Sequence, residues 1–336
     1  MPKVFPRRLG ALVLAAVSLA GCAANRVPTP NHASAEYIRS WGLKVIHADA
    51  AYRAGATGRG VTVALIDCGL QTAQPEVTAN VSPLSTDVAG PRRQPELDRH
   101  ADYVAGPLGS ALNGRGLVGV AYNATLLSVR ADFDGGWQGQ CAFRPADIAR
   151  AVDYAVDHQA RIIVMPLQAT KPLGPAFEAA LDRAARAGVV SVVAAGNGAA
   201  EQPAWPARYD VDPRFAGSVV VAGATRWDGE MTPWSNRAGP ASRWFIAAPG
   251  QSVLTDCGRK TCRLVSGTSF AAPYVAGALA LVMEGHPRLT GPEAAELLLQ
   301  AARDAGDPGV DAVYGRGVLD VAPAFSKAAA RSASRG

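Results

Sequence analysis

The feature that most constrains the fold is an alternation of apolar, β-branched runs with helical patterns. Runs that are apolar on both faces are typical of strands buried in a parallel sheet. Strand and helix alternate three times here, with strands expected at 125–130, 161–167 and 189–195 and helices beginning at Pro145 and Pro175. The sequence therefore predicts an α/β fold of three layers, with helices on both faces of a mostly parallel twisted sheet.

Three polar side chains stand at places where such a sheet exposes functional groups. Asp67 directly follows the apolar run 61–66, at the carboxyl end of an expected strand, where open α/β sheets bind ligands. His100 opens an expected helix. Ser269 is followed by small residues and would lie on the first turn of a buried helix, near the positive end of its dipole. Taken singly, Asp67 could form a turn and Ser269 could be an ordinary N-cap.

The order aspartate, histidine, serine is the one that subtilisin has. Four motifs resemble those of the subtilisin-like serine peptidases, in the same order: the aspartate motif at 63–69, the histidine motif at 100–106, the oxyanion motif at 195–198 and the serine motif at 267–273. The resemblance covers about residues 55–325 and implies the subtilisin-like fold and endopeptidase activity. Within the family the chain most resembles the peptidase domains of autotransporter subtilases, at 41–43, 119–122, 141–143 and 313–317.

The resemblance also implies a role for each motif residue. Asp67, His100 and Ser269 would form a catalytic triad, in which the histidine takes the serine proton and later passes it to the leaving amine. The side-chain amide of Asn197 would donate to the oxyanion, together with the backbone N–H of Ser269. Positions that in the family line the pocket for the residue before the cleaved bond are Met165, Pro166, Leu167, Gln168, Ala194, Ala195 and Gly196.

Two motifs depart from the family pattern. The family usually has Gly-Thr after the histidine, whereas Ala101 and Asp102 follow here. The Ala101 methyl would crowd the substrate, and a nearby Asp102 carboxylate would raise the pKa of His100. The family's Ser-Leu-Gly-Gly wall reads Pro-Leu-Gln-Ala at 166–169, so the proline removes a backbone donor and Gln168 fills space usually left open. These departures motivate an alternative, a weak or inactive peptidase-fold protein that binds peptides or partner proteins.

The amino terminus has the pattern of a bacterial lipoprotein signal. Three basic residues precede an apolar run at 9–20 that is too short to be a stable membrane span. The run ends in Leu-Ala-Gly before Cys22, which would carry the lipid after cleavage. A plain secretory peptide cut elsewhere is the alternative, and either one takes the protein out of the cytoplasm. Ala23, in place of an aspartate, favours the outer membrane of a Gram-negative cell.

Four segments are expected from these patterns: a lipoprotein signal peptide at 1–21, a lipidated tether at 22–35, a subtilisin-like peptidase domain at 36–325 and a disordered tail at 326–336. Without the signal peptide, 30 basic and 28 acidic residues leave a formal charge of +2. That balance is too weak to argue for nucleic acid as a partner. The expected partners are protein or peptide substrates, and a membrane through the lipid. We expect the protein to be monomeric.

Four cysteines remain besides Cys22, an even number for an oxidising compartment. Cys257 and Cys262 bracket a short turn and are the easiest pair to bridge. A second disulfide between Cys68 and Cys141 then follows by elimination.

The sequence predicts no zinc site and no required cofactor. The histidines outside the motif, which are His32, His47, His158 and His286, do not lie in a two-ligand spacing. Some members of the family bind structural calcium, and Asn113 lies where one such site would be. The loop after Asn113 contains no carboxylates, so the sequence does not support calcium there.

Overall fold

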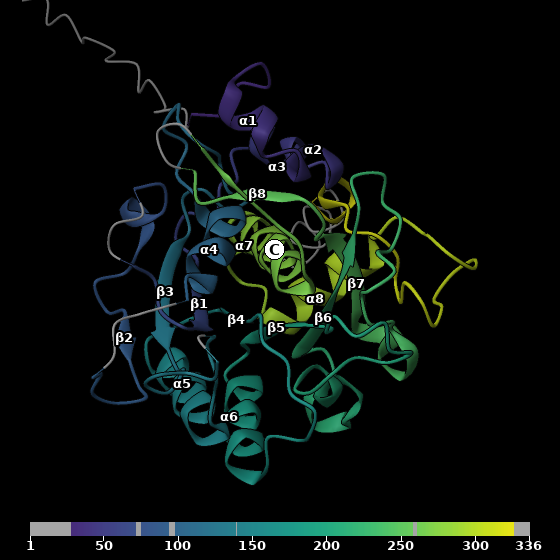
Figure 1. Ribbon diagram of the computed structural model, residues 1–336. Coiled ribbons are helices and arrows are strands. Elements are labelled where there is room, and N and C mark those ends of the chain that lie inside the picture. The colour runs from purple at the N-terminus through teal and green to yellow at the C-terminus, as the bar shows by residue number, and fades with distance from the viewer. Residues whose placement is uncertain (1–27, 72–74, 94–97, 139, 258–260, 326–336) are drawn as a thin grey trace, which may run out of the picture.

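A parallel sheet of seven strands forms the centre of the described part of the chain in a computed structural model (Figure 1). The structure describes residues 28–325 except for 72–74, 94–97, 139 and 258–260. The strands are β1 (Thr62–Asp67), β2 (Thr86–Asp87), β3 (Thr125–Arg130), β4 (Ile162–Met165), β5 (Val190–Ala194), β6 (Val219–Thr225) and β7 (Phe245–Pro249). Their order is β2-β3-β1-β4-β5-β6-β7, with every pairing parallel.

Helices cover both faces of this sheet (Figure 1). On one face lie α4 (His100–Gly109) and α7 (Thr268–Gly285), and on the other lie α5 (Pro145–Asp157) and α6 (Pro175–Arg186). The strands divide their side chains between the two cores by simple alternation. Val63 and Leu65 pack with α4 and α7, whereas Ala64 and Ile66 pack with α5 and α6. The predicted three-layer α/β fold is confirmed.

The order in which strands are added to the sheet reverses at β1. The strands β2 and β3, which follow β1 in the chain, lie on one side of it, and β4 to β7 lie on the other side. Where strand order reverses in this way, the loops that leave the carboxyl ends of the strands diverge and leave a crevice. Asp67 is the last residue of β1 and therefore lies at this crevice.

Shorter elements surround the sheet. They are α1 (Ala35–Arg39), α2 (Gly42–Val45), α3 (Asp49–Arg53), α8 (Gly291–Gln300), the antiparallel pair β8 (Val253–Thr255) and β9 (Arg263–Val265), and the 3-10 turns Thr78–Asn80, Ala207–Val211, Pro213–Phe215 and Gly239–Trp244. The helix α8 begins with a capping box, in which Thr290 and Glu293 bind each other's backbone N–H groups. Both predicted disulfides, Cys68–Cys141 and Cys257–Cys262, are present.

Several predicted segments lie outside the described residues. They include the signal peptide, Cys22, the first part of the tether, the carboxyl-terminal tail and three residues of the turn between Cys257 and Cys262. The proposed boundaries between segments stay predictions. Within the described ranges, no helix combines the length and the apolar character needed to cross a bilayer.

Candidate active site

Asp67 and His100 form a hydrogen-bonded pair at the end of the sheet. His100 is the first residue of α4, and its Nδ1 lies 2.8 Å from Oδ2 of Asp67. The carboxylate is buried, whereas 27% of the imidazole side chain is exposed. Phe270 packs beside the imidazole, with 5.7 Å between ring centroids. A bond at Nδ1 leaves Nε2 as the nitrogen that faces a reacting group.

The electrostatic surroundings of His100 favour its protonated form. Burial of the ring lowers the pKa, but the negative charge and the hydrogen bond of Asp67 raise it, and so does the charge of Asp98. The net effect is a pKa above the ordinary histidine value. The imidazole is thereby a stronger base than it would be in water.

Ser269 is the second residue of α7 and lies on the first turn of this buried helix, as the sequence predicted. Its hydroxyl is half-buried and donates a 2.9 Å hydrogen bond to the backbone carbonyl of Pro166. His100 and Ser269 line the same cleft, which has a volume of about 670 Å³.

Asn197 lines this cleft as well, and its amide has a fixed orientation. Its Oδ1 accepts hydrogen bonds from the backbone N–H of Thr268 at 2.9 Å and from the Thr268 hydroxyl at 3.0 Å. Because a backbone N–H can only donate, the atom that it reaches must be the amide oxygen. The Nδ2 donor of Asn197 is therefore directed away from Thr268. A donor held in this way requires little reorganisation when negative charge develops beside it.

The carboxyl ends of β4 and β5 contribute one wall of the cleft. Of the predicted pocket residues, Pro166, Leu167, Gln168 and Ala194 line it. The side chains of Met165 and Ala195 are packed in the core beneath α5 and α6, so these two residues can bound the cleft only through their backbones. Gly196 donates its N–H to the Thr268 hydroxyl at 3.1 Å, which helps to fix the loop that carries Asn197.

A model of the subtilase family matches residues 58–317 of the chain. This chain belongs to the subtilase family. It is 30% identical to subtilisin E of Bacillus subtilis (strain 168) over 304 residues, which are 87% of this chain and 73% of that protein. It is 29% identical to subtilisin BL of Lederbergia lenta over 280 residues, 83% of this chain and 96% of the relative. The protein is therefore a subtilisin-like serine endopeptidase, which acts on proteins or peptides.

A solved structure shares the fold of this subtilase. It is a protease from Pseudoalteromonas arctica PAMC 21717, with a TM-score of 0.73 and 24% sequence identity. The similarity covers 90% of this chain and 100% of that one. At this level of identity the likeness supports the subtilisin-like fold.

The two residues after His100 do not act as the sequence predicted. The methyl of Ala101 is completely buried in the core between α4 and the sheet, so it cannot crowd a substrate. Asp102 is also completely buried, and it pairs with Arg99, whose Nε lies 2.9 Å from Oδ2. Helix geometry turns both side chains inward. The second carboxylate that raises the pKa of His100 is that of Asp98.

Asp98 is a site residue that the motifs did not reveal. It precedes α4 and accepts the first N–H of the helix, with Oδ1 at 3.0 Å from the His100 nitrogen. Its Oδ2 lies 3.1 Å from the backbone nitrogen of Cys141. An aspartate two residues before a helix that starts at a histidine could have suggested this bond to the first helical N–H.

The loop after β3 forms the opposite wall of the cleft. Its contributors are Trp137, Gln140, Cys141, Ala142 and Phe143. The indole of Trp137 is 68% exposed, which is unusual for so large an apolar side chain. Sequence reasoning missed this wall because the loop carries no periodic pattern that would place it over the sheet.

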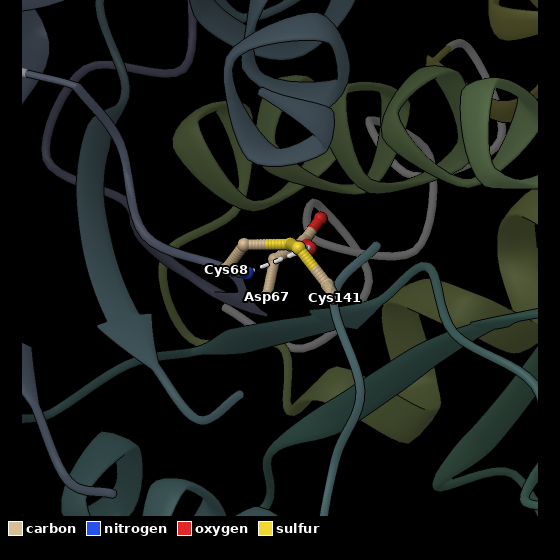
Figure 2. A group of neighbouring side chains, drawn as sticks. All are labelled: Asp67, Cys68 and Cys141. Carbon is tan, nitrogen blue, oxygen red and sulfur yellow. Dashed lines mark hydrogen bonds between the residues drawn. A yellow bond between two sulfur atoms is a disulfide. The ribbon is translucent and has the colours of Figure 1, made fainter. Parts of the chain in front are cut away.

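Among the described residues, one group of side chains has the spacing of metal ligands, but two of its members form a disulfide. This group consists of Asp67, Cys68 and Cys141 (Figure 2). The two sulfurs are joined to each other, so neither offers the thiolate that a metal would need. The prediction that the subtilase needs no metal at its site rests on the residue pattern.

The loop that begins at Asn113 binds two carboxylates through its backbone N–H groups. Its backbone N–H groups at Asn113 and Gly114 donate to Oε2 of Glu36, at 3.3 and 2.8 Å, and that of Leu117 donates to Oε1 of Glu76 at 3.3 Å. Calcium binds oxygen atoms, whereas N–H donors bind the carboxylates here. The carboxylates come from chain segments 41 to 78 residues away, so the local sequence could not show them.

Proposed function

We propose that this subtilase cleaves peptide bonds with Asp67, His100 and Ser269 as its catalytic triad, through a covalent acyl-enzyme. The observation that carries the proposal is the convergence of three groups on one cleft: the Asp67–His100 pair, the hydroxyl on the first turn of α7, and the fixed amide of Asn197. A base, a nucleophile and an oxyanion donor are the parts that acyl transfer to serine requires.

In the proposed reaction, Ser269 Oγ attacks the substrate carbonyl while His100 Nε2 takes its proton. Asp67 keeps the Nδ1 proton in place and stabilises the imidazolium. The oxyanion accepts hydrogen bonds from Asn197 Nδ2 and the backbone N–H of Ser269. The imidazolium then gives its proton to the leaving amine, and a water molecule hydrolyses the ester by the same route.

A fluorophosphonate probe tests this proposal directly. The purified chain from Ala23 onward should be labelled, and the Ser269→Ala variant should not be. Equal labelling of both, or no labelling of a chain that circular dichroism shows to be folded, would contradict the triad. The second result would favour the other candidate, a peptide-binding protein of this fold. The feature that supports this second candidate is the engagement of the Ser269 hydroxyl by Pro166.

We further propose that the peptidase domain, at 36–325, works outside the cytoplasm as a lipid-anchored monomer. The lipoprotein pattern before Cys22 supports this, as do the two disulfides, which are typical of oxidising compartments. The absence of aspartate after Cys22 favours the outer membrane. Cells that express the full chain should incorporate an alkyne-tagged fatty acid into it, and the Cys22→Ser variant should lose both the label and membrane fractionation. An unlabelled full chain would contradict the anchor.

A further inference from the structure

The Cys68–Cys141 disulfide lies directly against Asp67 (Figure 2), whose carboxylate is hydrogen-bonded to His100. Cys68 follows Asp67 in the chain, and its backbone N–H donates to Asp67 Oδ1 at 2.7 Å. Its sulfur lies 3.0 Å from the same oxygen, and the residue is completely buried. The disulfide therefore packs against the carboxylate that orients the imidazole.

The other half of the disulfide reaches the histidine through Asp98. The Asp98 carboxylate accepts from the backbone N–H of Cys141 with one oxygen and from the backbone N–H of His100 with the other. These bonds join the loop after β3 to the start of α4. Asp98 is thus the only group among the described residues that is hydrogen-bonded to both His100 and Cys141.

Together these contacts close a ring around the pair, which we call the disulfide ring: Asp67, Cys68, Cys141, Asp98 and His100. It ties together three chain segments, namely the end of β1, the start of α4 and the loop after β3. The one covalent link between distant segments is the disulfide, which spans 73 residues. Without it, the bond that joins the loop to the start of α4 within this ring would be the hydrogen bond from the Cys141 N–H to Asp98.

We propose that the Cys68–Cys141 disulfide and Asp98 are positioning groups for the Asp67–His100 pair, so that peptidase activity depends on the disulfide-bonded state. This inference rests on the triad proposed above. Displacement of a catalytic group by about 1 Å can lower a rate by on the order of a hundredfold, so small shifts of the ring matter. The other disulfide joins Cys257 to Cys262, in the connection between β8 and β9.

The charges that face His100 come from two sides. Asp67 lies at the end of β1, and Asp98 lies before α4. Phe270, on α7, contributes an uncharged ring. Arg99 is turned away, toward Asp102 and Asp256, at 2.9 Å from each. Asp98 therefore adds negative charge beside the imidazole as well as holding its backbone.

The test begins with a background that contains one disulfide, the Cys257→Ser/Cys262→Ser double variant from Ala23 onward. Dithiothreitol reduces the remaining bond: the Cys68–Cys141 disulfide gains two electrons and two protons, and the reagent becomes its cyclic disulfide. Thiol titration follows the reduction, near-ultraviolet circular dichroism follows folding, and a chromogenic peptide reports kcat and KM. The oxidised background should match the unaltered chain, which makes it the control.

Reduction should lower kcat by about tenfold or more with a much smaller change in KM, and reoxidation should restore it. In the intact chain, Asp98→Asn removes a negative charge, so the pH below which kcat/KM declines should move downward. Asp134→Asn, on the same loop but not bonded to the histidine, should leave that pH unchanged.

A folded, fully reduced chain that keeps kcat within about twofold of the oxidised form, together with an unchanged pH profile in Asp98→Asn, would overturn the inference. If reduction unfolds the chain, the pH dependence of kcat/KM in Asp98→Asn becomes the sole test of the inference. That variant keeps the disulfide and can be measured without reduction. Failure of the triad proposal looks different, since the oxidised chain would then show no Ser269-dependent labelling at all.

Discussion

The hydroxyl of Ser269 donates to the carbonyl oxygen of Pro166, at 2.9 Å, on the wall of the cleft formed after β4. In the proposed reaction, this hydroxyl must turn toward His100 before it attacks a substrate. Breaking one hydrogen bond of this kind costs about 0.5–1.5 kcal/mol, and a rotation about one side-chain bond is fast. Since 1.4 kcal/mol is about a factor of ten in rate, we expect this rotamer to lower the proposed activity by about tenfold at most.

The first prediction concerns Asn197. Asn197→Ala removes the fixed donor of the cleft and should lower kcat by about 10²–10³ with little change in KM, because in the proposed mechanism the donor acts on the oxyanion and not on the bound substrate. This magnitude is the one known for the oxyanion asparagine of subtilisin, to which the chain is related. Steady-state kinetics with a chromogenic peptide measures both constants.

Thr268→Val is the matched control for Asn197. It removes the hydroxyl that donates to Asn197 Oδ1 and accepts the Gly196 N–H, but it leaves the backbone N–H that donates to the same oxygen. This backbone N–H still orients the amide, so kcat should fall less than in Asn197→Ala. Equal losses of substrate binding and turnover in Asn197→Ala would argue against the oxyanion role.

The second prediction concerns pH. In the proposed mechanism His100 acts as a base only when it is neutral, and Asp67 and Asp98 raise its pKa above the ordinary histidine value. We therefore expect kcat/KM to fall as the pH is lowered through this raised pKa. Asp67→Asn should lower kcat strongly, because the imidazole loses the partner that fixes its tautomer. A profile that stays flat down to about pH 5.5 would exclude His100 as the base.

The sheet and Asp67 at its edge could be predicted from the sequence because buried strands have a recognisable apolar pattern. Buried parallel strands are largely apolar on both faces, so the run at 61–66 was visible as a strand, and Asp67 stood out as the charged residue directly after it. The predicted strand at 161–167 was too long, because β4 ends at Met165, directly before a proline that has no N–H to donate.

The surroundings of His100 could not be predicted in the same way. Whether Asp98 or Asp102 faces the imidazole depends on where α4 begins and which way each side chain turns. The structure starts the helix at His100, which places Asp98 two residues before it, where it accepts the His100 N–H, and places Asp102 in the core. The wall that contains Trp137 depends on contacts between distant segments, and local patterns carry no information about these.

The third prediction concerns the choice of substrate at Gln168. Its side chain lines the cleft, and its Oε1 accepts from the backbone N–H of Asn197 at 3.1 Å, so it occupies space beside the proposed oxyanion donor. Gln168→Gly should open this space. Cleavage after a large aromatic residue should then rise about tenfold relative to cleavage after alanine, within the range for filling an apolar pocket.

Gln168→Glu is the matched control, because it keeps the length of the side chain and an oxygen acceptor for Asn197. It should leave the ratio of aromatic to alanine cleavage unchanged and increase cleavage after lysine or arginine. Competition between paired peptides, analysed by mass spectrometry, gives the ratios of kcat/KM. An unchanged ratio in Gln168→Gly would mean that this side chain does not limit the pocket.

The fourth prediction concerns stability and Glu76. Burial raises the pKa of this carboxyl to about 7. Hydrogen bonds from the backbone N–H groups of Cys257 and Leu117 lower the pKa, but burial has the larger effect. Its Oε2 has no hydrogen-bond partner among the described residues. Since the folded state binds the proton more tightly than the unfolded state, whose pKa is near 4.5, Glu76 favours folding at low pH. That stabilisation is lost as the pH rises through the folded pKa of about 7.

Glu76→Gln keeps an acceptor for Leu117 and removes the titration. The free energy of unfolding is measured in urea at about pH 5 and at about pH 8 for both proteins. Its decrease between these two pH values should be larger in the unaltered chain than in the variant, by on the order of 2 kcal/mol. Asp210, whose pKa burial also raises to about 7, remains in both proteins and contributes equally to each. Identical pH dependence in the two proteins would show that Glu76 is ionised in the folded state throughout this range.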